Sequence, residues 1–169
     1  MTLIQCLDDD EAHLNLLGLV FELAGYDHLR THDNVEALSL LRIQPIDLFT
    51  QDLLRPNMSG VEFYRVMKSD DALRHIPVLI LSAAAGFPPG FVAECRSVYG
   101  DEYLSKPWGP SELVTTVAEL LARRGKHVLT DEERADRKEL VRAKYAPGAT
   151  SGERFDELWE RADTWLNKP

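Results

Sequence analysis

The chain has 169 residues, of which 44% are hydrophobic and 28% are charged, a balance typical of a globular protein. No run approaches the ~20 consecutive apolar residues of a membrane-spanning helix, and the acidic N-terminus is unlike a secretory signal. The net charge of -9 argues against DNA binding, because nucleic-acid binders usually present a basic surface. Cys6 and Cys95 lie in apolar segments, which favours buried thiols over a disulfide. We therefore expect a cytoplasmic protein without membrane contact.

Short apolar segments typical of strands alternate with segments of helical periodicity along most of the chain. The strand-like segments are, in chain order, residues 3–7, 26–32, 46–51, 77–81 and 102–105. Helical segments follow them at about residues 14–25, 33–41, 59–68, 90–99 and 110–121. The fourth strand-like segment is continuously aliphatic, which indicates a central strand buried on both faces.

Several residues mark the ends of the helical segments. Gly25 suits the end of the first helix, and Pro110 suits the first turn of the last. Asp33 and Glu36 have the spacing of a capping box at the start of the second. Strands that alternate with helices predict parallel βαβ units with right-handed crossovers. We therefore expect an α/β fold with a five-stranded parallel sheet, doubly wound by helices on both faces.

Polar side chains gather where the predicted strands end. They are Asp8 and Asp9 after the first strand, Asp52 after the third, Ser82 at the end of the fourth and Lys106 after the fifth. In an open α/β sheet, ligands bind at the carboxyl ends of the strands, so we expect these residues to lie together. Converging carboxylates at ~4 Å would repel by about 4 kcal/mol per pair at an effective dielectric near 20.

The chemistry of this group predicts a metal and a phosphoryl group. Carboxylate oxygens suit a hard divalent cation such as Mg²⁺, which would relieve the repulsion. The Lys106 ammonium and the Ser82 hydroxyl would add donors for an anion, as phosphoryl transfer requires. Each residue alone has an ordinary explanation: acids near a helix start are often caps, and a lysine or serine at a strand end is often solvated. The joint arrangement at successive strand ends favours a functional site.

These residues resemble the motifs of the receiver domains of two-component response regulators. The resemblance covers about residues 2–124. It rests on the acidic segment 6–10, on Asp52 to Gly60 with Pro56, on Ser82 with Ala83, and on Lys106 with Pro107 and Trp108. It implies a flavodoxin-like (βα)5 receiver domain at residues 1–125, standing alone except for a helical extension at residues 126–169.

By this resemblance, Asp52 accepts a phosphoryl group from a sensor histidine kinase or a phosphotransfer protein. Asp9, Asp52 and the backbone carbonyl of Leu54 are implied to hold Mg²⁺, with Asp8 helping through water. Lys106 is implied to pair with the phosphoryl oxygens. The reaction modifies the protein itself, so the resemblance implies a signalling protein rather than an enzyme with an external substrate.

The resemblance also implies a switch. Ser82 would swing toward the phosphoryl group, and Tyr103, at the aromatic switch position of the family, would turn inward. The result would be a changed protein-interaction surface around the fourth helix and fifth strand. Phe87 and Phe91 flank an unusual Pro-Pro-Gly segment there, and they are either core residues or part of a partner patch. His13 lies near the acidic residues, and we expect it on a solvated helix face.

Two other functions compete with this interpretation. One is a phosphohydrolase with an aspartyl-phosphate intermediate, although such enzymes carry a second aspartate where this chain has Leu54. The other is a degenerate receiver that acts as a dimerisation scaffold, which the complete set of acidic residues argues against.

The extension differs in charge from the first part. Residues 1–125 carry 10 Lys and Arg against 18 Asp and Glu, whereas residues 126–169 carry 9 against 10. Thr130 and Glu133 have capping-box spacing before a charged helix to about residue 145. After a linker at residues 146–152, a second helix has one apolar stripe, formed by Phe155, Leu158, Trp159, Ala162, Trp165 and Leu166. The stripe predicts packing on the chain's own domain, a homodimer through these helices, or partner docking, whereas a DNA-recognition helix is absent from the sequence.

Overall fold

All five predicted strands are present in the computed structural model, which describes residues 1–55, 59–83, 87–126, 130, 132–133 and 136. The strands are β1 (Leu3–Leu7), β2 (Asp27–Thr31), β3 (Leu48–Gln51), β4 (Val78–Ser82) and β5 (Glu102–Ser105). They form one parallel sheet in the order β2-β1-β3-β4-β5. The predicted doubly wound α/β fold is therefore confirmed.

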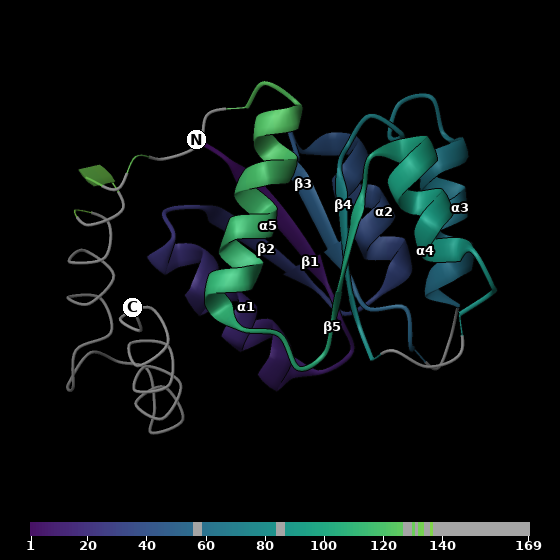
Figure 1. Cartoon of the computed structure of the whole chain (residues 1–169), viewed down its shortest axis with the longest axis horizontal. Helices are drawn as coiled ribbons and strands as arrows, with labels where there is room; N and C mark the ends of the chain where they lie inside the picture. The colour runs from purple at the N-terminus through teal and green to yellow at the C-terminus, as the bar shows by residue number, and fades with distance from the viewer. Residues whose placement is uncertain (56–58, 84–86, 127–129, 131, 134–135, 137–169) are drawn as a thin grey trace.

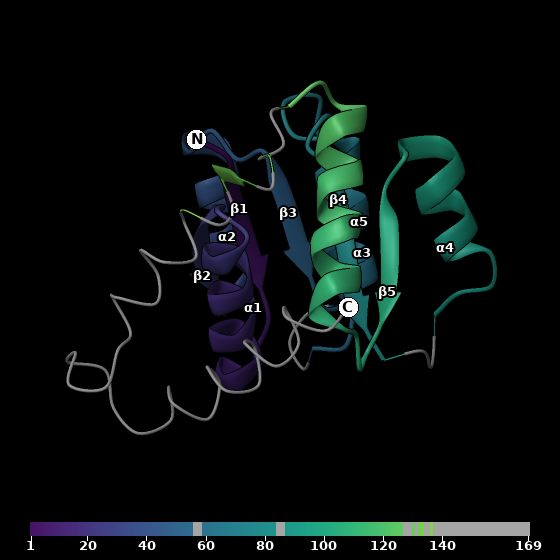
Figure 2. The ribbon, with the colours of Figure 1, turned by 60° about the vertical axis from the view of Figure 1, so that its left-hand side comes forward.

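Helices cover both faces of this sheet. They are α1 (Glu11–Leu23), α2 (Asn34–Ile43), α3 (Gly60–Ser69), α4 (Phe91–Glu94) and α5 (Pro110–Arg123). Figure 1 shows α1 and α5 on one side of the sheet and α2 and α3 on the other. Figure 2 shows α4 beside β5, at the edge opposite to β2.

The fourth helix differs from the regular helix that the sequence predicts. Only four residues are α-helical, and the helix then widens into the π-helical segment η1 (Cys95–Tyr99). The Tyr99 ring meets the Tyr64 ring edge-on at 5.9 Å, and the backbone N–H of Asp101 donates to the Cys95 carbonyl at 3.1 Å. The wider turn thus brings η1 against α3 while leading the chain into β5.

The core consists of two layers, one on each face of the sheet. Leu79 and Leu81 pack with α1 and α5, whereas Val78 and Ile80 pack with the helices of the other face. All five residues of β4 are buried, as the aliphatic segment predicts. Both cysteines are buried free thiols, which confirms that expectation.

Side-chain caps begin the helices where the sequence predicts them. Asp33 accepts hydrogen bonds from the backbone N–H groups of Val35 and Glu36, at 2.8 and 3.0 Å. The predicted box in the extension also forms. Thr130 N–H donates to the Glu133 carboxylate at 2.7 Å, and Glu133 N–H donates to the Thr130 hydroxyl at 3.3 Å. These side-chain bonds satisfy N–H groups that a helix leaves unpaired at its start.

The predicted linker and the apolar stripe of the last helix lie outside the described residues. The boundary near residue 125 and the helical extension therefore stay predictions. Within the described ranges, no helix is both long and apolar enough to cross a membrane.

Candidate functional site

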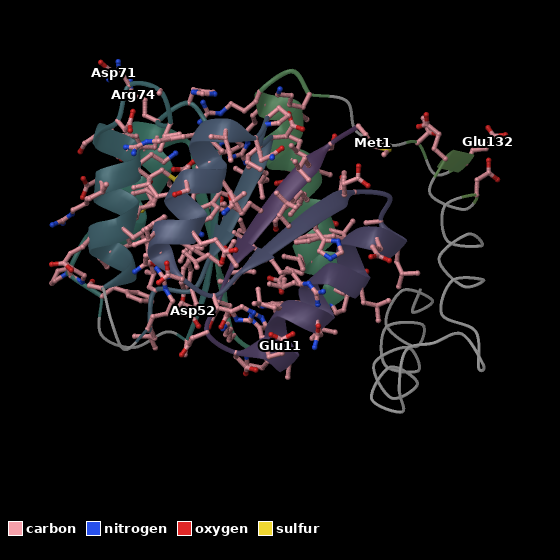
Figure 3. All side chains as sticks on the ribbon, turned by 180° about the vertical axis from the view of Figure 1, so that it is seen from behind. Met1, Glu11, Asp52, Asp71, Arg74 and Glu132 are labelled. Carbon is pink, nitrogen blue, oxygen red and sulfur yellow. The ribbon has the colours of Figure 1, made fainter. Side chains whose placement is uncertain are left out.

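Four of the predicted site residues meet at the carboxyl edge of the sheet. Asp8 follows β1, Asp52 follows β3, Ser82 ends β4 and Lys106 follows β5. Because the strands are parallel and adjacent, their carboxyl ends lie together. Figure 3 shows Asp52 at this end of the molecule, and Asp71 and Arg74 at the opposite end.

The Lys106 ammonium joins two carboxylates. Its Nζ lies 2.5 Å from Oδ2 of Asp52 and 3.0 Å from Oδ2 of Asp8. Asp8 is 2% exposed and Asp52 is 7% exposed, so both charges lie largely out of water. Burial alone would lower the pKa of Lys106, but the bonds and charges of the two aspartates outweigh it and raise that pKa. The ammonium is therefore held in its charged form between two acids.

Asp52 receives further hydrogen bonds at its other oxygen. The Ser82 hydroxyl donates to Oδ1 at 2.7 Å, and the backbone N–H of Leu54 donates to the same atom at 2.9 Å. The Ser82 hydroxyl is thus already directed at the carboxylate in this structure. Asp52 presents a carboxylate whose two oxygens are both oriented by donors.

The loop after Asp52 is held close to the strand at Gly60. Gly60 N–H donates to the Leu53 carbonyl at 3.1 Å, and the Gln51 side chain donates to the Gly60 carbonyl at 3.1 Å. A Cβ atom at Gly60 would lie 2.3 Å from the Cα of Leu53 and 2.8 Å from the Asp52 carbonyl oxygen. Only glycine allows this close approach.

Asp8 is the second anchored carboxylate. Its Oδ1 accepts the backbone N–H of Asp10 at 2.9 Å, and its Oδ2 contacts Nδ1 of His13. Burial alone would raise the pKa of Asp8, but the bonds from His13 and Asp10 and the charge of Lys106 lower it to about 2. Asp8 is therefore ionised throughout the neutral range.

The expectation that His13 lies on a solvated helix face is wrong. Its side chain is only 13% exposed, and its ring lies 5.4 Å from that of Trp108. The reason is that the first turn of α1 lies directly over the end of β1. Helical periodicity describes the faces of a helix, but it does not say what a first-turn residue meets beyond the strand end.

Tyr103 contacts both Ser82 and the segment that leads into α4. Its hydroxyl donates to the Ser82 backbone carbonyl at 3.0 Å, and its ring meets the Phe87 ring edge-on at 5.6 Å. Phe91 is 2% exposed and belongs to the core, whereas Phe87 is partly buried between Phe91 and Tyr103. The structure therefore resolves the open alternative for Phe91 in favour of the core.

Two predicted site residues lie outside the bonded group. The Asp9 side chain is exposed at the start of α1, and the Leu54 side chain is 48% exposed in the loop after β3. The backbone N–H of Leu54 donates to the Asp52 carboxylate. The backbone carbonyl of Leu54, which is the predicted metal ligand, takes no part in this hydrogen bond.

The donor set at this edge fits Mg²⁺. In the described part of the chain, no three His, Cys, Asp or Glu side chains are grouped to hold a metal by themselves. Mg²⁺ is, however, usually bound through one or two carboxylates and keeps several waters. Asp8 and Asp52 supply two such carboxylates, and both already converge on one cationic nitrogen, that of Lys106. Carboxylates that share a positive charge are suitable ligands for a hard cation.

The sequence did not predict two further charged groups, Arg55 and the Lys68–Asp101 pair. Arg55 donates from Nε to the Asp52 carbonyl at 3.1 Å, and its only sequence signal is a charge in the loop directly after the strand. Lys68 and Asp101 form a fully buried ion pair at 2.8 Å near the opposite edge of the sheet. Lys68 lies four residues after Tyr64, on the same apolar stripe, which is the signal that marks it as buried.

Comparisons with known proteins agree with this geometry. Residues 4–118 match the family described as the response regulator receiver domain. The chain is 33% identical over 118 residues to the polar-differentiation response regulator DivK of Brucella anthropi, covering 70% of this chain and 94% of that protein. A putative response regulator from Chloroflexus aurantiacus superposes with a TM-score of 0.63 at 28% identity, covering 72% of this chain and 98% of the other.

A receiver domain of a signal transduction histidine kinase from Syntrophus aciditrophicus gives a TM-score of 0.65 at 26% identity, covering 77% of this chain and 98% of the other. The chemotaxis protein CheY4 of Vibrio cholerae, at 23% identity and a TM-score of 0.62, shares the fold over 71% of this chain and 98% of its own.

Proposed function

The chain belongs to the family of response regulator receiver domains, whose mechanism is phosphorylation of an aspartate, and we propose that Asp52 is its phosphoryl acceptor. The observation that carries this proposal is the set of contacts around the Asp52 carboxylate. Lys106 lies 2.5 Å from one oxygen, and Ser82 donates to the other at 2.7 Å. No other aspartate at this edge combines a cation and a hydroxyl among its described partners.

The contacts account for the chemistry as follows. An Asp52 oxygen attacks the phosphorus of a phosphohistidine, the new O–P bond forms, and the P–N bond to the imidazole breaks. The Lys106 ammonium and the Ser82 hydroxyl then bind the phosphoryl oxygens, because both are already within hydrogen-bond distance of the carboxylate. Fixed donors of this kind stabilise charge that develops on transferred oxygens.

We assign the metal site to the same edge. Asp9, Asp52 and the Leu54 carbonyl would hold Mg²⁺, and Asp8 would bind it through water. The metal, when bound, neutralises charge on the phosphoryl oxygens. The exposed position of Asp9, which a hydrated ion can reach, and the low pKa of Asp8, about 2, which keeps that side chain anionic, support these roles.

The protein is a receiver-domain signalling protein, and receiver domains of this kind interact with histidine kinases or phosphotransfer proteins. We propose that the partner here is a sensor histidine kinase or phosphotransfer protein in the cytoplasm. The Tyr103 hydroxyl on the Ser82 carbonyl supports a switch in which phosphorylation moves α4 and β5. The extension at residues 126–169 would form a homodimer or pack on residues 1–125, and DNA binding is not part of this proposal.

Treatment with Mg²⁺ and acetyl phosphate, followed by intact mass measurement, tests the proposal. We expect one acid-labile phosphoryl adduct on the wild-type protein and none on Asp52→Ala. Asp71→Ala is the matched control, because Asp71 is exposed at the opposite end of the molecule (Figure 3). An adduct that persists on Asp52→Ala, or its absence from the wild type, would contradict the assignment.

A further inference from the structure

Arg55 places a second positive charge beside the acidic residues. Its Nε donates to the backbone carbonyl of Asp52 at 3.1 Å, and its Nη1 contacts the side-chain oxygen of Asn34 at the start of α2. Lys106 reaches Asp52 from β5, one edge of the sheet. Arg55 extends toward α2, which connects β2, at the other edge, to β3. The two cations therefore contact different atoms of Asp52, Arg55 the backbone carbonyl and Lys106 the side chain.

The Arg55 guanidinium is partly enclosed by protein. Its Cζ lies 5.6 Å from the centre of the Phe63 ring, a cation–π contact. The side chain is half-buried, and its Nη2 is buried without a hydrogen-bond partner among the described residues. A guanidinium stays protonated in proteins, so this position holds a permanent charge that water screens only partly.

The surrounding carboxylates act on this charge. Burial lowers the pKa of Arg55, and the charges that oppose this effect are those of Asp52, Asp8, Asp9 and Asp33. Three of these carboxylates are the predicted metal ligands. Arg55 therefore interacts electrostatically with the same oxygens that would bind Mg²⁺.

We propose that Arg55 is a positioning residue of the phosphorylation site, a fixed cation that holds the acidic residues together without metal and thereby weakens their binding of Mg²⁺. The inference rests on the proposed function, because it assumes that Mg²⁺ binds at Asp52. Its physical basis is that a fixed positive charge lowers the repulsion among carboxylates and repels a second cation. The site would thus be filled only when Mg²⁺ is abundant.

Calorimetric titration of the full chain with Mg²⁺ alone tests this inference. Arg55→Met keeps a long side chain over Phe63 and removes the charge. We expect it to bind Mg²⁺ about fivefold more tightly than the wild type, the order expected of one charge acting on a divalent ion through substantial screening. Arg55→Lys keeps the charge and should bind within about twofold of the wild type. Arg74→Met removes an arginine at the opposite end (Figure 3) and should bind like the wild type.

Equal or weaker Mg²⁺ binding by Arg55→Met would overturn the inference. Arg55→Gln is a second neutral variant in case the methionine disturbs folding, and it should also bind more tightly. A purely structural arginine would not tighten the site when removed, so this readout separates the two roles. Wild-type protein that binds no Mg²⁺ would overturn the metal assignment as well. If Arg55→Met binds Mg²⁺ with unchanged affinity and the Asp52 adduct still forms, the inference about Arg55 is overturned while the proposed function stands.

Discussion

The two ends of the sheet each hold a lysine–aspartate group, but only one group can be reached from water. Near the amino edge, Lys68 and Asp101 lie 2.8 Å apart and both side chains are 0% exposed. At the carboxyl edge, Lys106 contacts Asp52 and Asp8 at 2.5 and 3.0 Å, and its side chain is 24% exposed. The same pair of residue types therefore forms a closed contact at one end and an open one at the other.

The closed group is satisfied by the protein itself. Asp101 accepts from the Tyr64 hydroxyl at 2.7 Å and from the Val78 backbone N–H at 2.9 Å. Lys68 also donates to the backbone carbonyl of Ile76 at 2.7 Å. These contacts join α3 to the starts of β4 and β5. Burial lowers the pKa of Lys68, and the Asp101 charge only partly opposes this effect.

The open group has partners that a ligand can replace. Asp8 and Asp52 follow different strands, and Lys106 is the ammonium that both contact. Under the proposed function, an incoming cation or phosphoryl group would exchange partners with Lys106 without entering the core. The comparison teaches that exposure, rather than residue type, separates a closed ion pair from one that a ligand could reach.

The largest effect is expected at the closed end. Lys68→Met should lower the free energy of unfolding by about 3–5 kcal/mol, because it leaves a buried aspartate without its cation. Urea unfolding would measure this change. The double variant Lys68→Met with Asp101→Asn should recover part of the loss, since it removes the unpaired charge. A loss below about 1 kcal/mol, the scale of an exposed pair, would show that the pair is not structural.

A smaller effect is expected at the open end. Lys106→Met should cost about 2–3 kcal/mol without metal, less than a closed pair, because the Lys106 side chain is 24% exposed and water already screens its charge in part. Addition of Mg²⁺ should restore part of this loss, whereas it should not restore Lys68→Met. Thermal unfolding with and without Mg²⁺ would measure both. An equal response of the two variants to Mg²⁺ would break the comparison.

The smallest expected effect is the loss of stability at low pH when Asp8 is protonated. The pKa of Asp8 is lowered from 3.8 to about 2 in the folded protein, so its contribution is present above pH ~4 and lost as pH falls toward 2. The contribution is on the order of 2 kcal/mol. Unfolding of wild type and Asp8→Asn at several pH values would measure it. The stability difference between them should shrink as pH falls from 5 to 2, and a constant difference would contradict the role of Asp8.

Much of the site at the carboxyl edge was predictable, because its residues lie where the predicted strands end. Asp8, Asp52, Ser82 and Lys106 each follow or end an apolar strand, and parallel strands bring such residues to one edge. His13 and Arg55 were not predictable in the same way, because their contacts depend on how a first helical turn and a loop fold over that edge. Such contacts are set by three-dimensional packing, which periodicity does not encode.

The closed end was harder to predict than the open one. Asp101 precedes its strand, and nothing in its neighbourhood marks it as buried until Lys68 and Tyr64 are placed beside it. The π-helical turn of η1 was likewise unpredicted, because residues 95–99 have ordinary helical composition. Both features contact α3, which is distant in the sequence.

The close approach of Gly60 to Leu53 has a consequence for recombination between related proteins. Two hydrogen bonds and a steric limit tie Gly60 to the end of β3, so recombination must keep this glycine in register with the strand. A junction that replaces Gly60 itself, or shifts it by one residue, would displace the backbone of Asp52, the proposed acceptor.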